Sequence, residues 1–189
     1  IMFGEVVLGV INGTIAVHQL GVTIWMQFIL AISIVFALWW LFFPIISDRE
    51  CKEGLVSSSI FELLFIPALI GLGLLGASFN DIFSHFNEPG LQAEWISKCF
   101  GFSIGLFLMG IWAMMSFLKY PAIFLGFKRT AKLAFVTTAF LIVAFTCLSL
   151  QVPLVFHLLF VLIMLIALIL YLNSIWYNRI MKKDKEISG

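Results

Sequence analysis

Six apolar segments separated by short polar connectors account for most of the sequence. Each is close to the roughly 20 residues that a helix needs to cross the hydrocarbon core of a bilayer. Because backbone groups in lipid must be paired within their own segment, we expect these segments to be helices. The alternation of apolar and polar positions that marks a membrane strand is absent. The pattern predicts an all-α, polytopic membrane helix bundle with spans at about residues 1–17, 22–46, 60–79, 99–118, 133–151 and 154–177.

The composition agrees with this pattern and excludes an ordinary soluble domain. Hydrophobic residues make up 62% of the chain and charged residues 11%, and the mean hydropathy is +1.13. A soluble domain has about 25% charged residues. We therefore expect the lipid bilayer to be the main partner. The basic residues lie in short connectors rather than on a folded basic face, which argues against nucleic-acid binding.

The basic residues also predict an orientation. If the connectors alternate in side and the C-terminus lies inside, Lys98 is the only one of the 11 Lys and Arg residues outside. This bias follows the positive-inside rule. We predict a multi-pass protein of the cytoplasmic (inner) membrane, with a bundle over residues 1–178 and a basic cytoplasmic tail over 179–189. The basic residues on the cytoplasmic side are Arg49, Lys52, Lys119, Lys128, Arg129, Lys132, Arg179, Lys182, Lys183 and Lys185.

The first segment, FGEVVLGVINGTIA, carries polar residues within an apolar sequence. On a helix at about 100° per residue, Glu5, Gly9, Asn12, Gly13 and Ala16 fall on one stripe. An ionisable group inside a membrane span costs several kcal/mol, so it is usually placed where it has a use. Glu5 and Asn12 are therefore candidate substrate-binding or proton-binding residues of a pocket within the membrane. The alternative is a Glu5 that hydrogen-bonds a neighbouring helix and only fixes packing.

A second and weaker set of candidates lies on the predicted outer face. His18 and His157 fall at the outer ends of spans, and Asp81, His85 and Glu88 have the four- and three-residue spacing of one helical face. Such side chains can ligate a divalent metal, and a metal-bound water can do hydrolytic chemistry. However, a Pro-Gly pair interrupts this segment, and the sequence contains no HExxH motif. We expect solvated loop residues here and no metal site.

Two motifs resemble those of a known family. The segment FGEVVLGVINGTIA, residues 3–16, is similar to a span built around an apolar-Gly-Glu-x-x-Leu core, and FALWWLFF, residues 36–43, is similar to an Ala-Leu-Trp-Trp-x-Tyr-Phe element. Both are typical of the bacterial low-temperature-requirement protein A family of polytopic membrane proteins, in this order and separation. The resemblance implies that the chain is the C-terminal portion of a longer protein, whose N-terminal helices would be partners of the bundle. It implies no particular reaction.

Three hypotheses for function remain after this reading. A transporter or permease-like carrier that uses Glu5 and Asn12 is the leading one. A non-catalytic membrane protein for envelope or stress adaptation is the second. A membrane enzyme with the outer-face histidines and acids is the third, and we favour a protein that is not an enzyme. The sequence identifies no cofactor, and it leaves the oligomeric state open.

Overall fold

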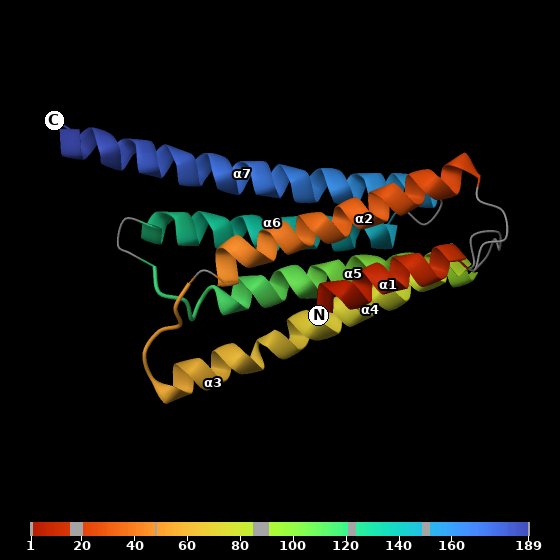
Figure 1. Cartoon of the computed structure of the whole chain (residues 1–189), viewed down its shortest axis with the longest axis horizontal. Helices are drawn as coiled ribbons and strands as arrows, with labels where there is room; N and C mark the ends of the chain where they lie inside the picture. Colours follow the sequence, from red (N-terminus) through yellow and green to blue (C-terminus); the bar gives the residue numbers. More distant parts are fainter. Residues whose placement is uncertain are drawn as a thin grey trace.

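The computed structural model is a bundle of helices that run roughly parallel to one long axis (Figure 1). It describes residues 2–15, 21–47, 49–84, 91–120, 124–148 and 152–188, without the side chains of 47, 84, 91–94 and 179–188. The elements are α1 (Met2–Ile15), α2 (Val22–Phe42), the π-helix η1 (Phe43–Ser47), α3 (Leu55–Leu63), α4 (Phe65–Ser84), α5 (Leu91–Met114), α6 (Leu125–Leu148) and α7 (Leu154–Ser188). The described part of the chain contains no strand, so the predicted all-α class is confirmed.

The predicted membrane character is confirmed as well. Five helical segments of the described chain are long and apolar enough to cross a membrane, and α1 is apolar but shorter. Many of their large apolar side chains are exposed, among them Trp25, Phe36 and Phe140. Such faces are suited to contact with lipid rather than with water. The five segments are Val22–Ile46, Leu55–Phe83, Trp95–Met114, Leu125–Leu148 and Leu154–Asn178.

The helices extend beyond the apolar segments seen in the sequence. The helical region of the third segment starts at Leu55, and a break at Leu64 divides it into α3 and α4. Pro67 explains the break, because proline lacks the amide hydrogen for the carbonyl four residues earlier and its ring crowds that carbonyl, here that of Leu63. Helix α6 starts at Leu125 rather than near 133, since its first two turns carry basic residues that hydropathy alone assigns to a connector.

The helices form a closed ring. Helix α1 packs on α4, α4 on α5, α5 on α6, α6 on α7, α7 on α2, and α2 again on α1. Helices α2, α5 and α7 run in one direction along the bundle, and α1, α4 and α6 run in the opposite one (Figure 1). The connector after α2 and the connector between α5 and α6 therefore meet at the same end. We call this the basic end, because Lys52, Lys119 and Lys128 lie there.

Four of the ring helices meet in an aromatic cluster, which we define as Phe3, Phe42, Phe65 and Phe107. The ring of Phe42 lies 6.1 Å from each of the other three between centroids, and the Phe3 and Phe107 rings are 5.9 Å apart. Phe107 is 1% exposed. The space between α1, α2, α4 and α5 at this level is thus filled by side chains.

Glycines allow the closest helix pairs to form. A Cβ atom added at Gly9 of α1 would overlap the backbone of Gly76 in α4, and one added at Gly13 would lie 2.9 Å from the Phe83 side chain. Likewise, one added at Gly71 of α4 would lie 2.9 Å from the backbone of α5. Small residues let membrane helices approach until their backbones touch. The seam of α1, α4 and α5 therefore depends on these positions.

Candidate functional site

Glu5 and Asn12 lie on the exposed side of α1. The buried face of this helix is Val6, Val10 and Gly13, which is centred about 100° around the helix from Glu5. Gly9 and Gly13 of the predicted stripe thus pack on α4, whereas Glu5 and Asn12 lie beside that contact and are exposed. Ala16 lies outside the described residues. Neither Glu5 nor Asn12 lines the cavity described below. Their role in binding stays a prediction.

The outer-face candidates lie in different environments. His18, His85 and Glu88 lie outside the described residues. Asp81 is exposed near the end of α4. His157 is only 2% exposed, and its ring lies 5.3 Å from that of Phe145. His157 is thus a buried side chain between α6 and α7, and the hypothesis of a joint site stays untested.

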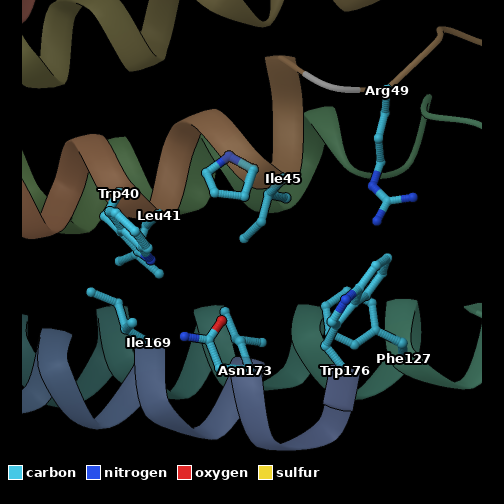
Figure 2. A pocket seen from close by; sticks show the side chains of 10 residues that line it. Trp40, Leu41, Ile45, Arg49, Phe127, Ile169, Asn173 and Trp176 are labelled. Atoms are coloured by element: carbon cyan, nitrogen blue, oxygen red, sulfur yellow. The ribbon is translucent and has the colours of Figure 1, made fainter. Parts of the chain in front are cut away.

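The structure instead shows a cavity at the basic end of the bundle. Its volume is about 390 Å³, within the range of roughly 300–1,000 Å³ typical of small-molecule sites. Residues of α2 and η1 face residues of α6 and α7 across it (Figure 2). The lining consists of Trp40, Leu41, Pro44, Ile45, Arg49, Phe127, Ile169, Leu172, Asn173 and Trp176. Apolar and aromatic side chains predominate, and Arg49 supplies the only formal charge among the described residues that line it.

Arg49 is held over two aromatic rings. Its guanidinium carbon lies 4.4 Å from the centroid of the Tyr120 ring and 5.2 Å from that of Trp176. Cations are attracted to aromatic faces, and the planar guanidinium stacks on them well. Among the described residues no carboxylate pairs with Arg49, and its buried Nε donates no hydrogen bond. Because Figure 2 shows the guanidinium pointing toward the cavity, its positive charge is available to a ligand.

The rings beneath Arg49 are fixed by further aromatic contacts. Trp176 stacks on Phe124, with 4.4 Å between centroids and 16° between planes, and Phe127 meets it edge-on at 5.6 Å. Burial raises the pKa of the Tyr120 phenol above its ordinary value of 10.0, although the Arg49 charge opposes this. The phenol is therefore neutral at pH 7 and able to donate, and its buried oxygen has no partner within the described chain.

Two backbone hydrogen bonds between the connector after α2 and the connector after α5, which we call the clasp, position Arg49. The amide of Lys52 donates to the Phe117 carbonyl at 2.8 Å, and the amide of Lys119 donates to the Glu50 carbonyl at 2.9 Å. The Lys119 ammonium also bonds the Glu53 carboxylate at 2.7 Å. These bonds join the connector after α2 to the one after α5. Arg49 directly precedes Glu50 and so is placed beside Tyr120, which follows Lys119.

The π-helix shapes one wall of the cavity. Pro44 is its second residue, and in an α-helix its ring would crowd the carbonyl of Trp40, four residues earlier. The wider π turn relieves this crowding, and π segments occur frequently at functional sites. Pro44 and Ile45 line the cavity as a result. The irregular turn is therefore part of the site.

Sequence reasoning did not find this cavity. It used Arg49 for orientation only. Two signals were present, namely Pro44 at the end of a long apolar segment and Asn173, a single amide after many apolar residues. Neither indicates on its own that α2 and α7 are neighbours, because that pairing joins segments more than 100 residues apart.

The sequence model described as bacterial low temperature requirement A protein (LtrA) matches residues 1–172. The match covers α1 to most of the membrane span of α7 and includes Trp40, Arg49 and Phe127 of the cavity. It ends just before Asn173. No curated protein and no solved structure matches the chain. Since the family match covers most of the chain, this multi-pass membrane protein belongs to the LtrA family.

Proposed function

We propose that this protein is a membrane carrier that binds a small organic anion in the basic-end cavity. One observation carries the proposal: the Arg49 guanidinium faces a cavity of about 390 Å³ and meets no carboxylate among the described residues. Removing a charge from water is costly, so an arginine at such a place is expected to have a counter-ion. Carboxylates and phosphates fit the guanidinium fork and accept two hydrogen bonds from it.

The surroundings of the cavity favour a carrier over an open channel. Leu41 lines the cavity, and its neighbour Phe42 belongs to the aromatic cluster that fills the adjacent space between four helices. A solute bound near Arg49 thus has no open path past this cluster. Transport would require movement of α2, and the irregular turn in η1 is a suitable place for it. Carriers commonly place their sites beside interrupted helices of this kind.

We propose that Glu5 and Asn12 couple transport to protons. Glu5 is exposed on α1, and α1 packs directly on α2, which forms the cavity wall. An ionised carboxylate facing lipid is unfavourable, so a further membrane helix with a donor group is expected to cover this face. A change of protonation at Glu5 could then shift the position of α2.

Flux measurements on proteoliposomes test the carrier. The purified chain is reconstituted, and uptake of acetate, benzoate, octanoate and phosphate is measured. We expect protein-dependent uptake of at least one organic anion, with a loss of about tenfold or more in Arg49→Gln, because hydrogen bonds to a charged group are removed. Arg129→Gln is the matched control, since Arg129 is exposed on α6 and does not line the cavity.

Two results would overturn the carrier proposal. The first is that none of the four anions shows protein-dependent uptake. The second is uptake that Arg49→Gln and Arg129→Gln reduce equally, since the basic end would then act only through its overall charge.

We further propose that the basic end faces the cytoplasm of a bacterial cell. The connectors that meet there, together with the first turns of α6, carry six of the seven basic residues outside the tail, as the positive-inside rule expects. A reporter fused after Gly189 should be active only in its cytoplasm-sensing form. Activity of a periplasm-sensing reporter at that position would reverse the assignment.

A further inference from the structure

The cavity has two chemically different halves. Arg49 lies at one side, close to Trp176 (Figure 2). Its guanidinium also lies over the ring of Tyr120. The other side is lined by aliphatic and aromatic groups such as Leu41 and Ile169. A small hydrophilic anion would satisfy the first half and leave the second half unfilled. The lining therefore matches a molecule with an anionic head and an apolar tail.

The two halves are ordered along the bundle as the parts of a lipid are ordered in a leaflet. Arg49 lies three residues beyond the apolar segment that ends at Ile46, and Trp176 lies two residues before the end of the one that closes at Asn178. Trp40 lies within the apolar segment that ends at Ile46, on the side of the cavity away from Arg49. The charged half thus lies at the membrane interface, and the apolar half extends toward the bilayer centre.

The cavity is bordered by exposed residues on the sides of two membrane helices. Trp40 on α2 is 53% exposed, and Pro44 and Asn173 are exposed as well. All three lie within apolar segments long enough to span the bilayer. The access to the cavity between α2 and α7 is therefore lateral, toward lipid. A molecule dissolved in the leaflet could enter with its tail, without passing through water.

We propose that the cavity takes a single-chain anionic amphiphile from the adjacent leaflet, with its phosphate or carboxylate on the Arg49 guanidinium and its tail along Leu41 and Ile169. The inference rests on the proposed function, because it names the ligand class of the same site. The buried Nε of Arg49 and the buried phenol of Tyr120 have no hydrogen-bond partner in the described chain, and the guanidinium that lies over the Tyr120 ring supplies the charge at the head position. The Asn173 amide points toward the space between the helices and supplies a further polar contact (Figure 2).

Native mass spectrometry of the purified chain in dodecyl maltoside tests this inference. Four probes are added at equal concentration: dodecyl phosphate, dodecanoate, dodecanol and inorganic phosphate. We expect one molecule of a tailed anion per chain, at an affinity at least about tenfold above those of dodecanol and of inorganic phosphate. Arg49→Gln should lower the affinity for dodecyl phosphate about tenfold, whereas Arg129→Gln should leave it unchanged.

A second variant separates loss of the site from loss of the fold. Ile169→Phe narrows the apolar half of the cavity and leaves Arg49 in place. It should therefore weaken the binding of dodecyl phosphate more than the binding of inorganic phosphate. The inference is overturned if dodecanol binds as tightly as dodecyl phosphate, if inorganic phosphate binds as tightly as the tailed anion, or if Arg49→Gln retains full affinity. Flux of acetate without any preference for a tailed anion would overturn it and leave the carrier standing. Tight binding of dodecyl phosphate without any flux would support the ligand class and overturn the carrier proposal.

Discussion

The two sides of the helix ring are packed by opposite means. Helices α1, α4 and α5 carry three glycines each, and these helices approach one another closely at five of them, namely Gly9, Gly13, Gly71, Gly76 and Gly110. Helices α2 and α7 contain no glycine and meet through large side chains. The first side is a close seam, and the second side encloses the cavity at the basic end.

The difference indicates that the two sides of the bundle have different roles. Without Cβ atoms, backbones come close enough that little space is left for anything else. Bulky side chains such as Trp40 and Trp176 hold helices apart and leave room for a ligand. The seam is therefore the rigid scaffold, and the α2–α7 side is the part able to bind and to move.

The largest effect on stability is expected from Gly9→Ala in the seam. The added methyl group would overlap the backbone of Gly76, so α1 and α4 must separate. We expect the free energy of unfolding to fall by about 1–3 kcal/mol. Gly4→Ala on the same helix is the control, because nothing lies within 4 Å of its Cβ position. The measurement is equilibrium unfolding in mixed dodecyl sulfate and dodecyl maltoside micelles. Equal changes in the two variants would show that the contact with Gly76 is not tight.

Enlarging a side chain on each side tests the comparison directly. Ala68→Val adds bulk against Gly110, whose Cβ position lies 3.0 Å from the Ala68 side chain, and should cost about 1–3 kcal/mol of unfolding free energy. Ile169→Phe adds bulk to the cavity wall and should change stability by less than about 1 kcal/mol, in either direction. If Ile169→Phe destabilises the protein as much as Ala68→Val, the α2–α7 side is as closely packed as the seam.

Glu5→Gln should have little effect on stability and a large one on coupling. The side chain is exposed, so we expect the free energy of unfolding to stay within about 0.5 kcal/mol. The glutamine amide keeps the shape of the glutamate side chain but cannot ionise. Uptake driven by a pH gradient should therefore be abolished, while exchange at equal pH persists. A variant that folds normally and keeps full pH-driven uptake would defeat the coupling role.

The smallest effect is expected at the clasp. A hydrogen bond from Lys119 and its charge lower the pKa of Glu53 below the ordinary value of 4.5. The stabilisation is therefore fully present above pH 4.5 and is lost as the pH falls through the lowered pKa. Both side chains are exposed, so solvent screens the pair. The unfolding midpoint of Lys119→Met should be slightly below that of the parent at pH 7, and the difference should shrink as the pH falls through the lowered pKa of Glu53. A difference that does not shrink with falling pH would place the effect in the backbone bonds.

The fold was largely readable from the sequence, whereas the site was not. Apolar length identifies the membrane helices, and the motif around Glu5 with the double tryptophan identifies the family. Hydropathy missed the early start of α6, because the first turns of this helix carry Lys128, Arg129 and Lys132. The cavity depends on the pairing of α2 with α7, on the π turn at Pro44 and on the clasp that places Arg49. These are contacts between distant segments, and no local pattern encodes them.

Quenching by a brominated amphiphile tests the binding of a tailed anion in the cavity most directly. Bromododecyl phosphate, with bromine in mid-chain, quenches tryptophans that its tail contacts. We predict saturable quenching that dodecyl phosphate displaces, that Trp40→Phe weakens and that Trp25→Phe leaves intact, because Trp40 lines the cavity and Trp25 lies at the opposite end of α2. Saturable quenching of equal strength in Trp40→Phe and the parent would contradict the account, because the tail would then lie outside the cavity.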